Sequence, residues 1–530
     1  MTNTRPLGAQ ISHMLKDRGV DVIFGIPGVH NQEMYRGIEE AGITHVLARH
    51  EQGAGFMADG YARASGKPGV AYVITGPGLC NIMTPMGQAY SDSVPLLVLS
   101  SCLDETVSKR GQLHQMKDQR AAASTVCDWS EEARTASAAY ALVDRAFGEF
   151  ETTRKRPKHI QVPIALLEAQ AETGWDVERS LAGNLPPPHR DVAKVFAEKL
   201  AAAQRPVFVL GGGAAASGGP IAEVIRKSGA ASFATYAGRG VICDDPLHFG
   251  AYLPRPDSAA VFAQADLVIS VGTDLAEVDL WRDDLGATCP HIRVNTDDEV
   301  IANRRAGDAG IKCDAGLFFD AVSGLMTEAG STWNAADIAA TRARWRAEVD
   351  AERPGIVPVC DVLRDCVPEG TMIYSDMTQL AYTAKEVWDM DRPGHWHHPT
   401  GFGTLGYATP AAIGGAVARK GKPTMAIIGD YGFHYTMAEL GVAVELKLPL
   451  PIILWDNTKL GEIEDSMVRA QIAPNAVVAH NPDFCKLAEA FGARAVAPTS
   501  LKDMQKAVRA AFDADGPTLI YLTPDITNAP

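Results

Sequence analysis

Short apolar runs that alternate with helical patterns along the whole chain constrain its fold more than any other feature. The first third holds DVIFGI, THVLA, VAYVIT, PLLVLSS and HIQVPI. The middle third holds PVFVLG, ASFAT, LVISVG and HIRVN, and the last third holds TMIYSD, TMAIIGD, PIILWDN, ARAVAP and TLIYLT. Such an alternation is typical of parallel sheets that are covered by helices on both faces. We therefore expect an α/β fold with three doubly wound parallel-sheet domains.

Two segments separate the three sets of predicted strands. NLPPPHRD, residues 184–191, is rich in proline and is typical of a linker. Residues 332–353 form a polar helical pattern that is rich in Ala and Arg and ends at Pro354. In a chain of 530 residues, three domains of roughly 150 to 190 residues are an ordinary division. We expect domains at residues 1–175, 190–330 and 354–530.

Charge and cysteine content narrow the classes of partner. The formal net charge is −15 and no long run of Lys and Arg occurs, so we expect neither a nucleic-acid partner nor a membrane partner. The nine cysteines are scattered without a C-x-x-C pair, which favours reduced thiols and a cytoplasmic protein. The first residues lack the apolar core of a signal peptide, and no apolar run reaches membrane-spanning length. These features favour a cytoplasmic protein.

Two predicted strands of the last third end in side chains that carry oxygen ligands. The run TMAIIGD ends in Asp430, and the run PIILWDN ends in Asn457. Because the carboxyl ends of parallel strands meet at one edge of a sheet, we expect the two side chains to lie close together. Carboxylate and amide oxygens suit Mg²⁺, and a strand–helix junction offers N–H groups to a phosphate. An N-capping aspartate and a turn asparagine are the alternative, but their positions at matching strand ends favour a metal site.

This part of the chain, residues 429–457, closely resembles the cofactor motif of thiamine diphosphate (ThDP) enzymes. In that family an aspartate and an asparagine bind Mg²⁺ together with a backbone carbonyl two positions further on. The resemblance implies that Asp430, Asn457 and the carbonyl of Lys459 are the metal ligands.

The motif departs from the family pattern at two positions. The usual Gly-Asp-Gly is replaced by Gly429-Asp430-Tyr431, and Gly432 follows one place later. The usual Asn-Asn is replaced by Asp456 and an asparagine. The ligand types are unchanged, whereas Tyr431 would place a bulky side chain beside the diphosphate.

Other segments also resemble ThDP enzymes, and they imply further cofactor contacts. GFGTLGYATPAAIGGAVA resembles the acetolactate synthase segment under the thiazolium ring, which implies Gly403 and Leu405. Leu405 stands where that family has an apolar residue that bends the cofactor. SDMTQLAY resembles a diphosphate loop and implies Thr378 and Gln379, while TGPGLCN implies Gly76.

The segment RHEQGAGFMADGYAR resembles the glutamate helix of the family almost letter for letter. The resemblance implies that Glu51 is catalytic, because a carboxylate bonded to the pyrimidine nitrogen N1′ keeps that nitrogen protonated. The small residues around Glu51 would let the ring approach closely. A glutamate favoured by the helix dipole is the alternative. The magnesium motif in the same chain favours the catalytic interpretation.

In the family, the glutamate helix of one subunit meets the magnesium motif of another. The resemblance thus implies a homodimer or homotetramer with active sites at the subunit interface, and pyrimidine-binding, middle and diphosphate-binding domains in that order. The middle domain contains G-x-G-x-x-A at Gly211, Gly213 and Ala216, a weak dinucleotide signal. Some relatives bind FAD there and many do not, and we do not expect FAD here.

The substrate residues are predicted from three further segments. FGIPGVHN implies Val29 and His30, QLHQMKDQ implies His114 and Gln115, and KLGEIEDSM implies Glu462. The segments GIPGVHN, GDYGF and LGEI together look most like ThDP enzymes of the 5-guanidino-2-oxopentanoate (2-ketoarginine) decarboxylase type. A guanidinium tail needs a carboxylate partner, although a solvated acidic turn would also explain Glu462. We expect a 2-oxo acid decarboxylase, and an acetolactate synthase-type carboligase, which adds a pyruvate-derived enamine to a second carbonyl, is the alternative.

Overall fold

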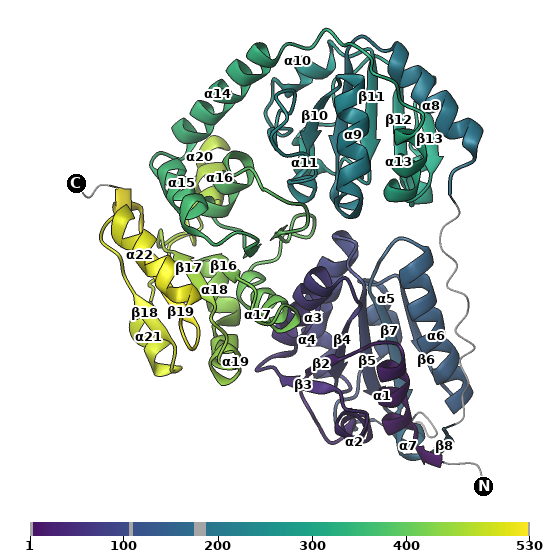
Figure 1. Cartoon of the computed structure of the whole chain (residues 1–530). Helices are drawn as coiled ribbons and strands as arrows, with labels where there is room; N and C mark the ends of the chain where they lie inside the picture. Colours follow the sequence, from purple (N-terminus) through teal and green to yellow (C-terminus); the bar gives the residue numbers. More distant parts are fainter. Residues whose placement is uncertain (1–3, 105–109, 174–186, 528–530) are drawn as a thin grey trace. The chain divides into compact units, whose positions relative to one another are not determined.

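The computed structural model describes residues 4–104, 110–173 and 187–527. The chain forms two compact units (Figure 1). The first unit comprises residues 1–183, 371–378 and 401–523, and the second comprises residues 184–370, 379–400 and 524–530. Part of the predicted linker, residues 184–186, lies outside the described residues, and α8 already begins at Arg190.

The first sheet of the first unit is parallel and has the strand order β3-β2-β4-β5-β7-β6. Its strands are β2 (Val22–Gly25), β3 (Thr44–Leu47), β4 (Gly69–Val73), β5 (Leu96–Cys102), β6 (Trp129–Glu132) and β7 (Lys158–Pro163). The helices are α1 (Leu7–Asp17), α2 (Gln32–Glu40), α3 (Glu51–Ser65), α4 (Pro77–Ser91), α5 (Gln119–Ser124), α6 (Ala136–Thr152) and α7 (Ile164–Glu168). A short antiparallel pair joins β1 (Thr4–Pro6) to β8 (Gln170–Glu172).

The second sheet of the first unit contains the parallel order β14-β16-β17-β19-β18. Its strands are β14 (Met372–Ser375), β16 (Thr424–Gly429), β17 (Pro451–Trp455), β18 (Arg494–Val496) and β19 (Thr518–Leu522). The helices are α17 (Ala408–Ala418), α18 (Asp430–Thr436), η3 (Met437–Glu439), α19 (Leu440–Glu445), α20 (Gly461–Arg469), α21 (Phe484–Ala490) and α22 (Leu501–Phe512).

The second unit contains a parallel sheet of order β10-β9-β11-β12-β13. The strands of this sheet are β9 (Pro206–Leu210), β10 (Ala231–Ala234), β11 (Leu267–Val271), β12 (His291–Asn295) and β13 (Ala309–Lys312). The second unit also contains the short β15 (Trp396–His397), which is not part of this sheet. The helices between residues 190 and 323 are α8 (Arg190–Ala202), η1 (Gly212–Ser217), α9 (Gly218–Ser228), η2 (Tyr236–Gly238), α10 (Ser258–Phe262), α11 (Glu277–Leu280), α12 (Asp298–Ala302) and α13 (Ala315–Ser323). The later ones are α14 (Ala335–Glu352), α15 (Ile356–Cys366), α16 (Gln379–Val387) and η4 (Pro524–Thr527).

The three parallel sheets confirm the predicted fold class, and every predicted apolar run contains a strand. In the first sheet, neighbouring residues of β5 belong to different cores, since Leu97 and Val98 pack on opposite faces. Strands buried on both faces have continuous apolar sequences, which made them predictable. The edge strands β6 and β13 were not predicted, because WSEE and AGIK are only partly buried and hold few apolar residues. The domain boundaries stay a prediction.

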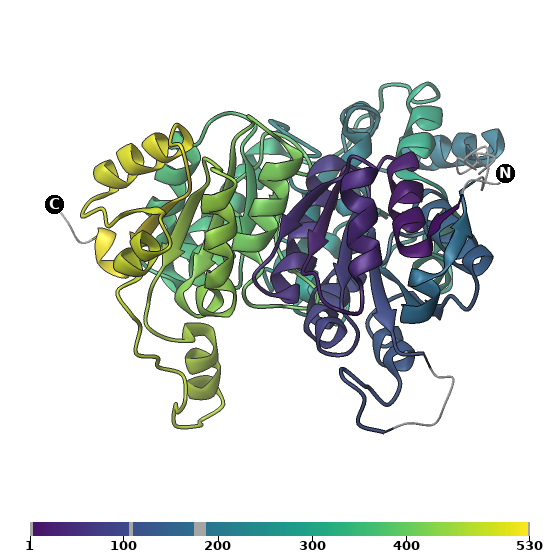
Figure 2. The ribbon, with the colours of Figure 1, turned by 90° about the horizontal axis from the view of Figure 1, so that it is seen from below.

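Helices α3 and α17 of the first unit pack backbone against backbone (Figure 1, Figure 2). A Cβ atom on Gly60 would lie 2.0 Å from the carbonyl oxygen of Ala411, and one on Gly414 would lie 1.9 Å from that of Met57. An ion pair of the buried Asp59 and the partly buried Arg63 lies beside this contact, with a carboxylate oxygen 2.7 Å from the guanidinium. Glycine is required at these crossings because any side chain would separate the two helices.

Gly60→Ala should lower the free energy of unfolding by about 1–3 kcal/mol, because the added methyl group meets backbone that cannot yield. Gly148→Ala, in the interior of α6, is the matched control, since a Cβ there meets nothing within 4 Å. That substitution should stabilise the protein by roughly 0.5–1 kcal/mol through helix propensity. Urea unfolding followed by circular dichroism measures both variants. Equal stability of Gly60→Ala and wild type would contradict the packing.

A lysine is buried in the second unit. Lys385 of α16 lies with its Nζ atom 4.0 Å from the ring centroid of Tyr236 and 5.2 Å from that of Tyr382. Burial, and then the charge of Arg239, lower the pKa of Lys385 to about 7. A lysine with so low a pKa makes stability depend on pH.

Lys385→Met should be most stabilising relative to wild type near neutral pH, with the difference shrinking as pH rises. The unfolded chain takes up a proton at this lysine below pH 10.5, whereas the folded chain does so only below about 7. Wild-type stability should therefore fall by about 1.4 kcal/mol for each pH unit on going down through this window. Denaturant unfolding at several pH values measures the slope. Lys199→Met, at an exposed position, is the control. If the free energy of unfolding of Lys385→Met relative to wild type changed with pH as little as that of Lys199→Met, the prediction would be refuted.

Candidate functional site

Glu51 begins α3, and its side chain is 8% exposed. Nδ2 of Asn81, in α4, donates a hydrogen bond to Oε2 of Glu51 at 2.9 Å. A Cβ atom on Gly78 would lie 3.3 Å from Oε1 of the same carboxylate. A carboxylate has about four acceptor positions, so one amide does not saturate it. The structure therefore holds a buried carboxylate at a helix N-terminus, and the Asn81 amide uses only part of its capacity to accept hydrogen bonds.

A second buried carboxylate, Glu439, holds the segment before α3. Oε1 of Glu439 accepts hydrogen bonds from the backbone N–H groups of Arg49 at 3.1 Å and His50 at 2.9 Å. A Cβ atom on Gly53 would lie 2.1 Å from the same oxygen. Burial raises the pKa of Glu439 to about 7, and the charge of Glu51 acts in the same direction. Glu439 thus ties α3 to the end of η3.

The predicted cofactor residue Gly76 forms the turn between β4 and α4. Its φ of 71° and ψ of −105° are accessible mainly to glycine. A Cβ atom there would lie 2.3 Å from the carbonyl oxygen of His114. The turn and the loop that carries the predicted substrate residues are therefore in close contact.

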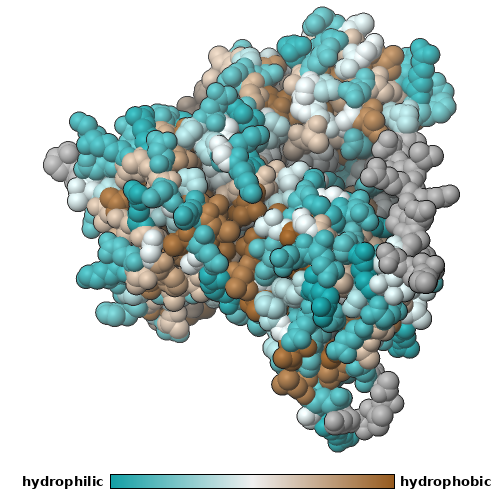
Figure 3. All heavy atoms as spheres, turned by 60° about the horizontal axis from the view of Figure 1, so that its bottom comes forward, coloured by the Kyte–Doolittle hydropathy of each residue, from teal (hydrophilic) through white to brown (hydrophobic). Residues whose placement is uncertain are grey.

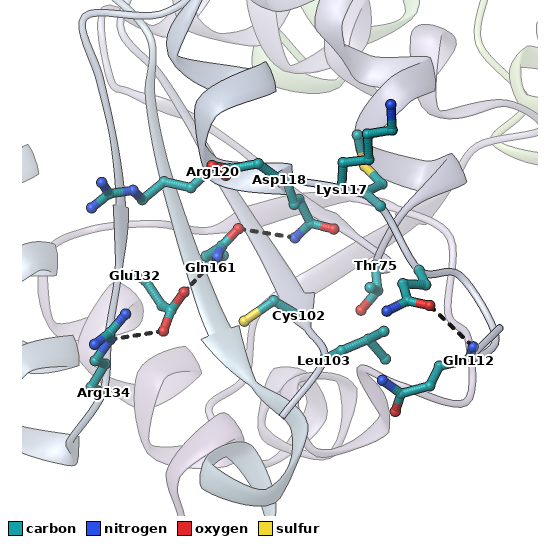
Figure 4. A pocket seen from close by; sticks show the side chains of 13 residues that line it. Thr75, Cys102, Leu103, Gln112, Lys117, Asp118, Arg120, Glu132, Arg134 and Gln161 are labelled. Atoms are coloured by element: carbon teal, nitrogen blue, oxygen red, sulfur yellow. Dashed lines mark hydrogen bonds and ion pairs between the residues drawn. The ribbon is translucent and has the colours of Figure 1, made fainter. Parts of the chain in front are cut away.

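The structure brings together His30 and His114, whose rings meet edge to face with centroids 4.9 Å apart. Burial, and then the neighbouring His114 ring, lower the pKa of His30. Gln115 lines a pocket of about 330 Å³, and the wall includes Thr75, which precedes the Gly76 turn (Figure 4). Val29 lies on the loop after β2 and is 60% exposed.

Asp430 and Asp456 follow neighbouring parallel strands, because the register pairs Gly429 with Trp455. Burial raises the pKa of Asp430 to about 6, and the charge of Asp456 adds to the increase. Nδ2 of Asn481 donates to Asp430 at 2.8 Å and to Asp456 at 2.9 Å. This amide holds the two carboxylates at the end of the sheet.

Asn457 and Lys459 occupy the loop after β17. Oδ1 of Asn457 accepts a hydrogen bond from the backbone N–H of Lys459 at 3.2 Å. The side chain of Lys459 forms an ion pair with Glu464 at 2.5 Å. Glu462 lies in the same first turn of α20, and its side chain is half-buried.

The residues at this edge fit a hard divalent cation. Asp430 supplies a buried carboxylate and Asn457 an amide oxygen, both suited to Mg²⁺. The described residues contain no cluster of three or more His, Cys, Asp or Glu side chains suited to a metal. A cation here would thus need oxygens from a backbone carbonyl, water or a bound diphosphate, which is the ligand set that a ThDP site offers.

The predicted diphosphate residues surround the start of α18. A Cβ atom on Gly429 would lie 3.1 Å from Oγ1 of Thr378. Tyr431 is the half-buried second residue of α18, and a Cβ atom on Gly432 would lie 2.9 Å from Oδ2 of Asp376. Small residues and Thr378 therefore line the turn in which the phosphate is predicted.

The loop with Gly403 and Leu405 lies in the same unit. Gly403 has a φ of 68°, and Leu405 is half-buried. Oδ2 of Asp376 accepts a hydrogen bond from the backbone N–H of Gly406 at 2.8 Å. Gln379 is the first residue of α16 and belongs to the second unit.

Sequence reasoning missed four residues with buried polar contacts in this region: Asn81, Asp376, Glu439 and Asn481. The first three lie inside segments that resemble the family, namely TGPGLCN, SDMTQLAY and residues 429–457. The polar side chains of these segments were therefore the available signal. Asn481 lies beyond every motif, and nothing in its sequence context marks it.

Models of the thiamine pyrophosphate enzyme family match three parts of the chain. The N-terminal TPP binding domain matches residues 5–122, the central domain residues 193–322, and the C-terminal TPP binding domain residues 376–522. The chain belongs to the thiamine pyrophosphate enzymes, which confirms the predicted family and its ThDP cofactor. Among the described helices, none has the length and apolar character that crossing a bilayer requires.

Individual relatives refine this assignment. The chain is 40% identical over 527 residues to the probable 2-ketoarginine decarboxylase AruI of Pseudomonas aeruginosa, covering 98% of this chain and 94% of that protein. It is 27% identical to the large subunit of acetolactate synthase isozyme 2 of Escherichia coli, with 98% and 95% covered. It is 28% identical to the acetolactate synthase large subunit IlvB1 of Mycobacterium tuberculosis, with 92% and 82% covered.

Proposed function

We propose that this protein is a ThDP- and Mg²⁺-dependent decarboxylase of 2-oxo acids, with 5-guanidino-2-oxopentanoate as its substrate. The observation that carries the proposal is the 40% identity to a probable 2-ketoarginine decarboxylase across 98% of this chain and 94% of that protein. The buried Glu51 and the paired strand ends with Asp430 and Asn457 support it.

ThDP, when bound, supplies the carbanion-stabilising centre that a 2-oxo acid decarboxylation needs. Glu51 would accept a hydrogen bond from the pyrimidine nitrogen N1′ and keep a proton on that atom. Asp430, Asn457 and the carbonyl of Lys459 would hold Mg²⁺. These roles assign residues 1–175 to pyrimidine binding, 190–330 to a middle domain and 354–530 to diphosphate binding.

The remaining proposed cofactor contacts divide by the part of ThDP that they would meet. Thr378, Gln379 and the turn Gly429, Tyr431 and Gly432 would lie along the diphosphate. Gly403 and Leu405 would lie under the thiazolium ring, and Gly76 would lie beside the reacting atoms.

For the guanidinium tail, Glu462 is the proposed partner. Its half-buried carboxylate lies in the first turn of α20, close in sequence to the proposed metal ligands Asn457 and Lys459. The lowered pKa of His30 favours a neutral ring at neutral pH, which would not repel a cationic substrate. Val29, His114 and Gln115 would complete the substrate side.

An acetolactate synthase-type carboligase is the second candidate. The near full-length similarity to acetolactate synthases, at 27% and 28% identity, favours it. The proposed cofactor residues serve both reactions, so the product distinguishes them.

The proposed assembly is a homodimer or homotetramer in the cytoplasm. All nine cysteines are free thiols, as expected of a reducing compartment. Figure 3 shows apolar groups between polar ones on one face of the molecule. Large apolar side chains are exposed on several segments near predicted site residues, namely Val29, Leu113, Phe402, Tyr435 and Ile463. An interface through these segments would bury them.

The middle domain is proposed to work without FAD. A Cβ atom on Gly211 would lie 2.3 Å from the carbonyl oxygen of Gly272, and one on Gly213 would lie 2.8 Å from Cα of Gly272. Packing against this neighbouring loop therefore explains both glycines of the G-x-G-x-x-A segment, whose third position is Ala216. No close approach of a dinucleotide is needed to explain them.

The test is CO₂ release from a panel of 2-oxo acids, with and without ThDP and Mg²⁺. The panel holds the oxo acids of arginine and the branched-chain amino acids, together with pyruvate and phenylpyruvate. We expect the arginine-derived acid to react fastest and all turnover to stop when ThDP and Mg²⁺ are withheld. Acetolactate as the main product from pyruvate, with no release from the arginine-derived acid, would contradict the proposal and favour the carboligase.

A further inference from the structure

We propose, on the basis of the role given above to Glu51, that Gln119 is a positioning residue of the active site. Gln119 is the first residue of α5 and is 7% exposed. Its side-chain amide accepts a hydrogen bond from the Gly76 turn, from which α4 begins, and Asn81 of α4 donates to the Glu51 carboxylate.

The Gln119 amide makes contacts that fix its orientation. Its Oε1 accepts a hydrogen bond from the backbone N–H of Gly76 at 2.8 Å, and its Nε2 donates to the carbonyl oxygen of Ser101 at 2.8 Å. Because a backbone N–H can only donate and a carbonyl can only accept, the amide has one allowed orientation. Nε2 also lies 3.1 Å from Oγ of Ser100.

A chain of side chains braces Gln119 from the other direction, along the wall of the pocket (Figure 4). Nε2 of Gln119 donates to Oε1 of Gln161 at 3.2 Å, and Gln161 donates to Glu132 at 2.9 Å. Arg134 in turn donates to Glu132 at 3.0 Å. Rotation of the Gln119 amide would break several of these bonds together, so the side chain is a rigid support.

The supported turn is itself constrained. Gly76 has φ of 71° and caps the N-terminus of α4. It also packs against the backbone of His114, where a Cβ atom on Gly76 would lie 2.3 Å from the carbonyl oxygen. His114 also has a positive φ of 63°. A shift of the turn would therefore displace the loop with His114 and Gln115.

The same turn sets the position of Glu51's neighbours. Gly78 and Asn81 both lie in the first turns of α4, close after Gly76. Asn81 donates to the Glu51 carboxylate at 2.9 Å, and a Cβ atom on Gly78 would lie 3.3 Å from that carboxylate. Gln119 does not touch Glu51, so it would act through α4. Misplacement of a catalytic group by about 1 Å can cost about 100-fold in rate.

The test compares Gln119→Leu with Gln161→Leu. The same substitution at Gln161 removes a partner of Gln119 but leaves the bond to Gly76. In the full-length holoenzyme, hydrogen–deuterium exchange read by mass spectrometry follows the peptide with Gly76. We expect exchange there to quicken by about two- to tenfold in Gln119→Leu and to stay near wild type in Gln161→Leu. We also expect kcat to fall by about 10- to 100-fold only in Gln119→Leu.

Gln119→Glu covers the case in which the leucine variant does not fold. It keeps an oxygen for the Gly76 N–H but loses the donor to Ser101, so the Gly76 amide should stay protected. Three results would overturn the inference. They are exchange at Gly76 as slow as in wild type in Gln119→Leu, faster exchange at Gly76 in Gln119→Glu, and a loss of kcat in Gln161→Leu that equals the loss in Gln119→Leu. Glu51→Gln is measured alongside. Full turnover by that variant would refute the role of Glu51, while the exchange data would still decide whether Gln119 holds the turn.

Discussion

The start of helix α3 is held by buried hydrogen bonds and backbone packing, and the rest of the site depends on this constraint. Asn81 donates to the Glu51 carboxylate, and Glu439 accepts from the backbone N–H of His50. Further along α3, Gly60 lies against the backbone of Ala411. A carboxylate at the end of a fixed helix cannot retreat from a ligand, which is the condition for preorganised catalysis.

The sequence was sufficient to predict the parallel sheets, because strands buried on both faces have continuous apolar runs. It was also sufficient to predict that Asp430 and Asn457 follow neighbouring strands, since βα topology places strand ends together. It was insufficient for the supports. Glu439 reaches residues 49 and 50 across 390 and 389 positions, and no local periodicity encodes such a contact. Partly buried edge strands such as β6 were missed for a related reason, since neighbours in space decide their burial.

The predicted cofactor residues and the predicted substrate residues lie in different surroundings. Buried carboxylates and glycine-dependent close contacts surround the predicted cofactor residues, and these features suit chemistry shared by a whole family of enzymes. Of the predicted substrate residues, Val29, His30, His114 and Gln115 lie on loops, where Val29 is 60% exposed, and Glu462 lies in the first turn of α20. Exposed loops vary at little cost to stability, so specificity is expected to reside there. Substrate specificity is therefore expected to depend on a few side chains, whereas the chemistry shared by the family depends on the fold.

The most direct test of the central claim is the exchange of the C2 proton of bound ThDP with D₂O, measured by NMR after rapid acid quench. The claim is that Glu51 activates the cofactor through N1′ without touching the substrate. Wild-type protein should exchange this proton far faster than free ThDP, and Glu51→Gln should lose about 10²- to 10⁴-fold of that rate while still binding the cofactor. Equal exchange in the two proteins would contradict the account.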